Sequence, residues 1–164
     1  MVALHHELPE HAPAIERLLD QAFGAERWQK TCQRLRDGQA PDRNLSLVAL
    51  DGDELVGTVR LWRDRLGRGR RGLMLGPLAV DERRRGEGIG TELMEAAMAR
   101  IEAAGEPSVF LVGDPGYYRR FGFEPDPTTG LNLPGPVERP RFLGREFRPG
   151  ALSKAKGLVR PLAA

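Results

Sequence analysis

Three closely spaced glycines, Gly86, Gly88 and Gly90, follow an apolar run of strand length and precede a stretch with helical periodicity. Glycine lacks a Cβ atom, so its backbone can adopt positive φ and allows a ligand to come close. The first turn of a helix also carries N–H groups without intrahelical partners and the positive end of the helix dipole. The stretch from Gly86 to Thr91 therefore predicts a site for an anionic group such as phosphate.

The spacing of these glycines excludes two common phosphate-binding motifs. A Walker A loop requires a lysine after its last glycine, and no lysine follows here. The dinucleotide-binding motif Gly-x-Gly-x-x-Gly would place its third glycine at Thr91. The pattern that remains is Arg85-x-x-Gly88-x-Gly90 directly after a strand, and a tight strand-to-helix turn without a ligand is the alternative interpretation.

Two adjacent tyrosines, Tyr117 and Tyr118, begin a second segment whose side chains could take part in a reaction. This segment ends at Phe123. A tyrosine has a pKa near about 10 and a thiol one near about 8.5. A phenol can therefore protonate a departing thiolate without ionising itself at neutral pH. The alternative is that the two rings are a packed aromatic pair at the edge of the core.

In order and spacing, Arg85-x-x-Gly88-x-Gly90 and the aromatic-Tyr-x-x-x-Gly-Phe segment resemble two motifs of the GNAT superfamily of N-acetyltransferases. The lead-in Val112–Pro115 is similar to that of a bacterial YhbS-like branch. The resemblance covers residues 45–123 well and residues 2–37 by element order only. It implies a GNAT-type α/β fold, with a central mixed, mostly antiparallel sheet flanked by helices. The parallel fourth and fifth strands of that sheet would splay apart.

The resemblance also implies a reaction, the transfer of an acetyl group from acetyl-CoA to an amine by direct attack, without a metal or an enzyme nucleophile. Tyr118 would be the catalytic acid for the departing thiolate, and a backbone N–H near Leu78–Val80 would stabilise the oxyanion. The cofactor-binding residues that it implies are Leu78, Ala79, Val80, Arg85, Gly86, Glu87, Gly88, Ile89, Gly90, Thr91 and Tyr118.

No residue stands out as the general base, because the apolar run Leu73–Val80 holds no ionisable side chain. The candidates are Asp53, Glu54, Asp81, Glu87 and the N-terminal histidines. A non-catalytic acyl-CoA-binding or sensing module of the same fold is therefore the main alternative function. The resemblance implies a small-molecule or peptide amine as acceptor without identifying it, and a homodimer is compatible with it.

The elements that must position these groups follow from hydrophobic periodicity. An apolar stripe predicts a helix from Pro9 to Phe23, and the polar segment from Arg27 to Asp37 predicts a second helix on the surface. Strands are expected at 2–6, 45–50, 54–62 and 73–80, with a hairpin turn at Asp51-Gly52. Gly76-Pro77 inside the last of these strands predicts a bulge or a sheet edge.

The rest of the chain completes the expected α/β order. A helix should run from the glycines to about Ala104, followed by a buried strand, Ser108–Val112, parallel to the strand before the helix. Further strands are expected at 130–133 and 141–147. The chain end at 161–164 is expected to be frayed.

Composition sets broader limits. With 164 residues, 40% of them hydrophobic, the chain suits a single domain over residues 1–164. No apolar run approaches the roughly 20 residues of a membrane span, and a cytoplasmic location is expected. The lone Cys32 agrees with a reducing compartment. Five arginines between Arg63 and Arg71 suggest a solvated hairpin loop or a contact with an anionic ligand, and nucleic-acid binding is the less favoured interpretation because only Trp62 accompanies them.

Overall fold

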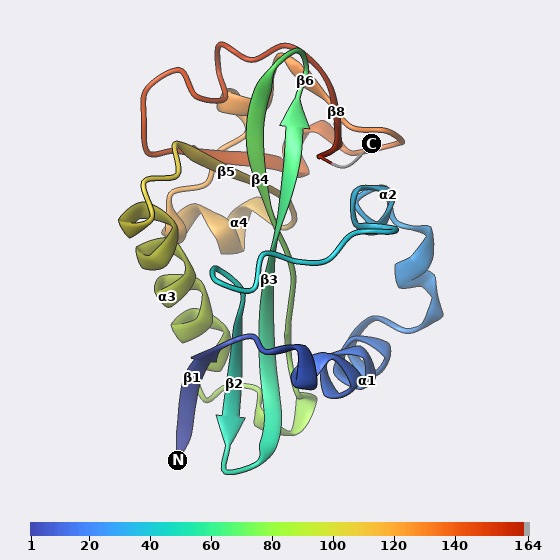
Figure 1. Cartoon of the computed structure of the whole chain (residues 1–164), viewed down its shortest axis with the longest axis vertical. Helices are drawn as coiled ribbons and strands as arrows, with labels where there is room; N and C mark the ends of the chain where they lie inside the picture. Colours follow the sequence, from blue (N-terminus) through green and yellow to red (C-terminus); the bar gives the residue numbers. More distant parts are fainter. Residues whose placement is uncertain (163–164) are drawn as a thin grey trace.

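The computed structural model describes residues 1–162, which form one twisted sheet with helices on both faces (Figure 1). The sheet order is β1 (Val2–His6), β2 (Leu47–Asp51), β3 (Glu54–Leu66), β4 (Arg70–Val80), β5 (Ser108–Val112) and β7 (Phe142–Glu146). Neighbours are antiparallel except β4 and β5, which are parallel. Strand β8 (Gly157–Pro161) pairs with the far end of β3 and with the short β6 (Leu131–Asn132). This is the mixed, mostly antiparallel sheet that the sequence predicts.

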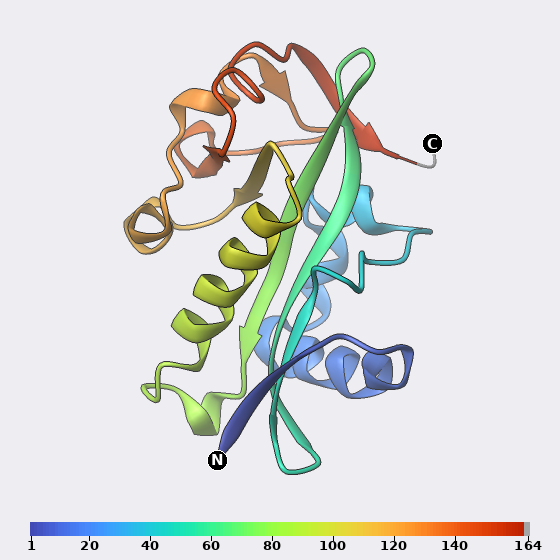
Figure 2. The same ribbon diagram turned by 60° about the vertical axis from the view of Figure 1, so that its left-hand side comes forward.

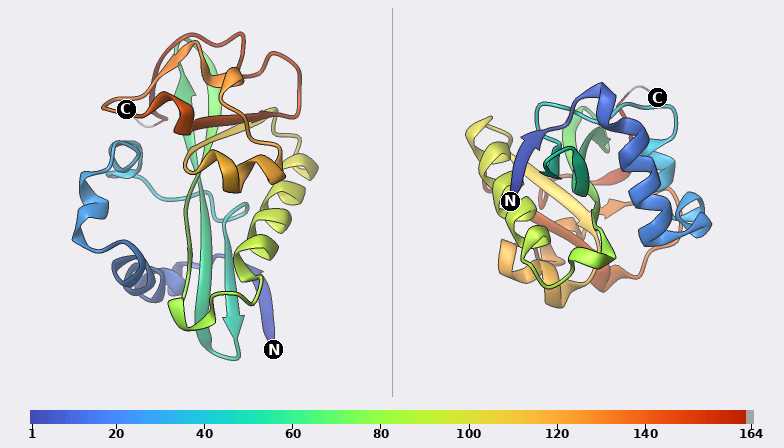
Figure 3. Two further views of the ribbon diagram at one scale, coloured as in Figure 1. Left: turned by 180° about the vertical axis from the view of Figure 1, so that it is seen from behind. Right: turned by 90° about the horizontal axis from the view of Figure 1, so that it is seen from below.

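The helices divide between the two faces of the sheet (Figures 2 and 3). Helix α1 (Ala12–Phe23) and the short α2 (Gln33–Arg36) cover one face, and α3 (Ile89–Ala103) covers the other. The alternation of side chains along β2 serves both layers, since Leu47 and Ala49 pack with α3 while Val48 packs with α1. None of the helices within residues 1–162 is long and apolar enough to cross a membrane.

Close approach of α3 to the sheet depends on a glycine in β3. A Cβ atom on Gly57 would lie 2.9 Å from the Leu93 side chain and 3.1 Å from that of Ile89. Both of these α3 residues are buried in the largest core cluster. The absence of a side chain at Gly57 thus lets the first half of α3 settle directly on β3 and holds the start of that helix near the end of β4.

The β3–β4 hairpin is longer than the sequence predicts. The strands extend to Leu66 and begin again at Arg70, so the arginine-rich stretch is mostly paired strand rather than a loop. Its side chains are partly engaged, because Arg63 forms ion pairs with Asp42 at 3.0 Å and Glu106 at 2.6 Å. The strand pairing with β8, which the sequence analysis did not anticipate, extends β3 past Trp62.

Strand β4 carries the predicted bulge. Val59 of β3 pairs with Leu78 and Leu61 pairs with Leu75, so that the two residues Gly76 and Pro77 face a single residue of β3. The buried Trp62 indole N–H donates a hydrogen bond of 2.6 Å to the Gly76 carbonyl. This bond uses a backbone acceptor that the bulge removes from the strand ladder, and the interpretation of Gly76-Pro77 as a bulge is confirmed.

Two other expectations need correction. The expected surface helix from Arg27 to Asp37 is instead a 3₁₀ turn over Ala25–Gln29 followed by α2, a single helical turn. Cys32 and Leu35 are buried against β3 and β4, so tertiary packing overrides the helical propensity of this polar segment. At the other end, the expected fraying is wrong for Pro161, which ends β8, and positions 163–164 lie outside the described residues.

Candidate functional site

Strands β4 and β5 diverge after a very short stretch of parallel pairing. Their only paired residues among those described are Met74 and Phe110, beyond which β4 bends at its bulge and β5 ends at Val112. A cavity of about 630 Å³, here called the larger cavity, lies beside the opening. Its walls include Leu75–Leu78 of β4, Leu111–Gly113 at the end of β5 and Tyr118. Residues between positions 23 and 36 and between positions 136 and 141 complete them. The structure thus shows the splay of the two parallel strands.

The side chains of the two tyrosines point to different parts of the structure. Tyr118, in the short helix α4 (Pro115–Tyr118), lines the larger cavity, and its ring covers Gly113 so closely that a Cβ atom there would clash. Burial, with a contribution from neighbouring Tyr117, raises the pKa of Tyr118 to about 12. Its phenol therefore keeps its proton at neutral pH.

Tyr117 turns away toward the start of α3. Its hydroxyl would lie 3.3 Å from a Cβ atom on Gly90, and the Arg120 guanidinium stacks on its ring at 4.4 Å. The rings of Tyr117 and Tyr118 meet edge to face, with centroids 4.9 Å apart. Each tyrosine thus supports the other, but only Tyr118 faces the larger cavity.

The glycine turn at the start of α3 is open. Gly86 and Gly88 have φ values of 85° and 82°, and nothing lies within 4 Å of the place where a Cβ atom would project from either. The first hydrogen bond of the helix runs from the Glu92 N–H to the Gly88 carbonyl at 3.0 Å. The N–H groups of Ile89, Gly90 and Thr91 precede that bond and are thus available to an anion.

The three successive arginines before this turn differ in their partners. Arg83 and Arg84 are held by carboxylates of the protein, whereas Arg85 is exposed and forms no ion pair within residues 1–162. The partners are Asp81 and Glu54 for Arg83, and Glu87 and Asp51 for Arg84. Arg85 is consequently the arginine of this run with a free charge, and the side chain of Glu87 is engaged by Arg84, leaving its backbone for a ligand.

The three β4 residues expected near the cofactor have different surroundings. Leu78 lines the larger cavity, Ala79 packs under α1, and Val80 packs against the α3 cluster. Among the described residues, only the Leu78 side chain of this group reaches the cavity, so Ala79 and Val80 could contribute through their backbone.

None of the acidic or histidine side chains proposed as a base lines the larger cavity. Glu54 and Asp81 both pair with Arg83, which follows the C-terminal end of β4. The sequence analysis missed two acids here. Glu138 lines the cavity from an exposed loop. Asp64 is fully buried on β3, and its charge acts on Cys32 and Arg36 of the cavity wall. The alternation of Trp62, Asp64 and Leu66 on one face of β3 was the available signal for Asp64.

Asp64 has unusual surroundings for a carboxyl group. Both of its oxygens are buried and neither has a hydrogen-bond partner within residues 1–162. Burial, opposed by the charge of nearby Arg36, raises the pKa of Asp64 from 3.8 to about 8. Most of the Asp64 carboxyl is therefore neutral at pH 7.

Cys32 lies at the wall of the larger cavity although it is distant from both motifs in the sequence. Its side chain is buried, and burial raises the pKa of the thiol. A protonated thiol is a poor nucleophile. The geometry therefore places Cys32 near the site but gives it the properties of a packing residue.

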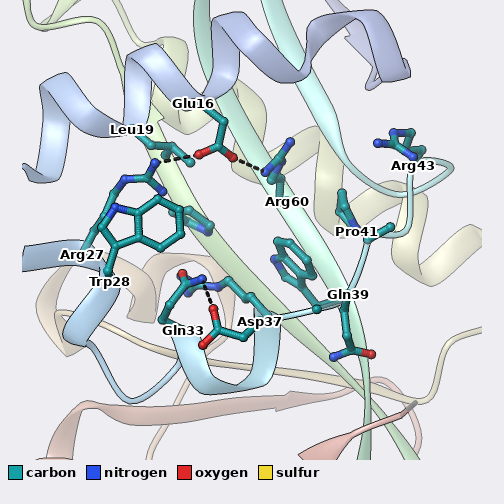
Figure 4. Close-up of a pocket in the computed structure, with 15 residues that line it drawn as sticks. Glu16, Leu19, Arg27, Trp28, Gln33, Asp37, Gln39, Pro41, Arg43 and Arg60 are labelled. Carbon is teal, nitrogen blue, oxygen red and sulfur yellow. Dashed lines mark hydrogen bonds and ion pairs between the residues drawn. The ribbon is translucent and has the colours of Figure 1, made fainter. Parts of the chain in front are cut away.

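A smaller cavity of about 360 Å³ lies between α1, the α2 segment and β3 (Figure 4). Four arginines belong to its wall, and Glu16 joins two of them, at 2.6 Å from Arg27 and 3.3 Å from Arg60. Arg60 is also held by the fully buried Glu7 at 2.9 Å. The smaller and larger cavities share Arg27, Arg36 and Pro77. They are therefore neighbours, with these side chains between them.

Comparison with known proteins agrees with this geometry. Residues 12–123 match the acetyltransferase (GNAT) family. The chain is 33% identical over 156 residues to the uncharacterized N-acetyltransferase YhbS of Escherichia coli K12, an alignment that covers 93% of this chain and 92% of that protein.

Solved structures give the same result. The crystal structure of E. coli YhbS in complex with CoA superposes with a TM-score of 0.80 and 29% identity, covering 98% of this chain and 89% of that one. A GNAT acetyltransferase from Brucella melitensis in complex with acetyl-CoA has a TM-score of 0.70 and 28% identity, covering 91% and 90% of the two chains. These similarities show, in agreement with the splayed strands and the open glycine turn, that the chain belongs to the GNAT family of acetyltransferases.

Proposed function

We propose that the protein transfers the acetyl group of acetyl-CoA to an amine in the larger cavity. The observation that carries this proposal is the path of β4. It borders the cavity from Leu75 to Leu78 and leads, through Val80, to the open glycine turn before α3. The two similar proteins whose structures contain CoA or acetyl-CoA support the choice of acyl donor.

The residues present suit a CoA thioester. The open places beside Gly86 and Gly88, the free N–H groups of the first turn of α3, and the unpaired Arg85 would together hold the pyrophosphate. When bound, the thioester supplies an acetyl group activated for attack by a nucleophile. The chain itself must then orient the acceptor, stabilise negative charge and provide a proton.

Two groups of the chain are proposed to act on the reacting atoms. A backbone N–H near Leu78, beside the bulge, would donate to the oxyanion of the tetrahedral intermediate. The Tyr118 hydroxyl would give its proton to the departing thiolate. The high pKa of Tyr118 ensures that the proton is present before the reaction begins.

Deprotonation of the acceptor amine need not depend on one strong base. Five cationic side chains line the larger cavity, against one acidic side chain, Glu138. The cations are Arg27, Lys30, Arg34, Arg36 and Arg141. Nearby positive charge lowers the pKa of an ammonium group, because it disfavours the charged form. An acceptor amine in this cavity would therefore reach its neutral, nucleophilic form more readily than in water.

An acceptor panel tests the proposal. Purified protein is mixed with acetyl-CoA and single amines, free thiol is followed with time, and the products are identified by mass spectrometry. We expect thiol release that depends on the amine, together with an N-acetylated product. Tight binding of acetyl-CoA without amine-dependent release for any acceptor would contradict the proposal and favour a non-catalytic acyl-CoA-binding module.

A further inference from the structure

Arg36 occupies the boundary between the two cavities. It is the last residue of α2 and belongs to the walls of both. One terminal nitrogen of its guanidinium lies 3.4 Å from the place where a Cβ atom would project from Gly76. Arg36 is therefore next to the bulge of β4, close to the backbone proposed to stabilise the oxyanion.

Arg36 differs from the other arginines of the smaller cavity in having no carboxylate partner. Arg27, Arg43 and Arg60 each form an ion pair with Glu7, Glu16 or Asp20. Within residues 1–162 the Arg36 side chain donates only to the Gln33 amide oxygen, at 3.5 Å, and its Nε is buried without a partner. An arginine so placed retains unused donors as well as its charge.

Asp64 does not neutralise Arg36. Burial lowers the pKa of Arg36, and the charges of Cys32 and Asp64 oppose this shift. Neither Asp64 oxygen accepts a hydrogen bond from a described residue. The raised pKa of Asp64 leaves most of that carboxyl uncharged at pH 7. An unpaired, partly buried guanidinium is unfavourable by itself, and a bound anion would relieve that cost.

The Arg36 guanidinium is also separated from the turn that is proposed to bind the cofactor phosphates. Residues 86–91 follow the end of β4, whereas Arg36 lies beside Gly76, before the pairing of Leu78 with Val59. The excess of cations in the larger cavity is therefore available to a ligand other than the pyrophosphate. Because the thioester end must lie near the bulge for the proposed chemistry, that ligand is the acceptor.

We infer that the acceptor is an amine that also carries a carboxylate, and that Arg36 binds the carboxylate while the amine faces the thioester. This inference rests on the proposed acetyl transfer. A planar guanidinium matches a carboxylate with two parallel hydrogen bonds, which fixes orientation as well as position. Arg36 is thereby a specificity-determining residue.

Matched amine pairs test the inference. Each pair contains a carboxylate and its primary carboxamide, such as β-alanine with β-alaninamide and phenylalanine with phenylalaninamide. Rates with acetyl-CoA are corrected for the fraction of neutral amine. We expect kcat/KM to favour the carboxylate by about ten- to a hundredfold, the range for a charge-assisted hydrogen bond. In Arg36→Met the preference should disappear, and in Arg36→Lys it should be reduced.

Arg148→Met is the matched control, since it removes one exposed arginine outside both cavities. It should keep the preference of the wild type. Equal use of carboxylate and carboxamide, or a preference that survives Arg36→Met, would overturn the inference. So would an Arg36-dependent preference for succinyl-CoA over acetyl-CoA, because the arginine would then bind the acyl chain.

Calorimetry gives a reading that does not require turnover. The same pairs are titrated into protein saturated with CoA, and Arg36-dependent binding of the carboxylate members alone supports the inference. Binding of neither member, or of both equally, overturns it. Failure of the proposed function is a different result, the absence of thiol release with all amines, and efficient acetylation of neutral amines would contradict only the carboxylate requirement.

Discussion

Arg85 is the residue whose role can be tested with least disturbance to the fold, because it is exposed and its two predecessors already have carboxylate partners. We predict that Arg85→Ala raises the Kd for CoA by about ten- to a hundredfold, which corresponds to about 1.5–3 kcal/mol for a charge-assisted contact. Pantetheine, which lacks the pyrophosphate, should bind equally to both proteins. Calorimetry with both ligands decides, and equal losses would show that Arg85 acts on the structure of the turn.

Tyr118 should affect turnover rather than binding. Tyr118→Phe retains the ring that covers Gly113 but removes the acidic proton, so we expect kcat to fall by about 10²–10⁴-fold with little change in acetyl-CoA affinity. Tyr117→Phe is the matched control, since its ring faces α3, and it should leave kcat nearly unchanged. Full kcat in Tyr118→Phe, with chemistry limiting the rate, would exclude the proposed acid role.

Asp64 predicts a dependence of stability on pH. Its pKa is raised from 3.8 to about 8 by burial, so the native state holds a proton that the unfolded state loses near pH 4. Its contribution is fully present below about pH 4, declines by up to about 1.4 kcal/mol per pH unit, and is lost once the pH passes about 8. Urea denaturation at several pH values should show that Asp64→Asn flattens this decline. An unchanged slope in the variant would assign the decline to other groups.

Residues within one turn could be predicted from the sequence, whereas residues brought together by packing could not. The glycine turn is local, and its spacing alone indicated open backbone before a helix. Arg36, Asp64 and Cys32 come together because α2 packs on β3 and β4, and their sequence neighbours carry no sign of it. The candidate bases Glu54 and Asp81 lie outside the wall of the larger cavity, where Arg83 holds both of them, and the sequence around them did not indicate this.

Among the elements, the bulge in β4 is the feature on which the proposed site depends. The Trp62 indole supports it through its bond to the Gly76 carbonyl. We predict that Trp62→Phe lowers the free energy of unfolding by about 1–3 kcal/mol, because a buried acceptor loses its partner. It should also lower kcat, since Leu78 follows the bulge. Trp28→Phe is the control, because Trp28 is 52% exposed, and equal stability losses in urea denaturation would contradict the supporting role.

Element type was easier to predict than element length. Hydrophobic periodicity predicted α1, α3 and the neighbouring strands, because apolar residues recur in each of them with the period of a helix or of a strand. The β3–β4 hairpin exceeded its expected length because pairing with the distant β8 stabilises polar strand residues. The α2 segment was shorter than expected because burial of Cys32 and Leu35, rather than helix propensity, sets its path.

Across the whole molecule, the two faces of the sheet would supply different parts of the proposed reaction. The α3 face holds the open turn proposed for the cofactor, and the face of α1 and α2 holds the cavity that is lined by four arginines (Figures 1 and 4). Strand β4 joins them, because its bulge lies near α2 and its end leads to α3. In the proposed reaction, the acyl donor and the acceptor would meet where β4 and β5 diverge, as direct transfer requires.

Rapid mixing of stoichiometric protein with acetyl-CoA, with and without the best acceptor, tests direct transfer to an amine most closely. Free thiol is followed by a chromogenic reagent, with protein alone as the control for Cys32. We predict thiol release only in the presence of the amine, and no acetylated protein by mass spectrometry. A burst of one thiol per protein without the amine, accompanied by an acetylated residue, would contradict direct transfer, and no release in either arm would contradict acetyl transfer itself.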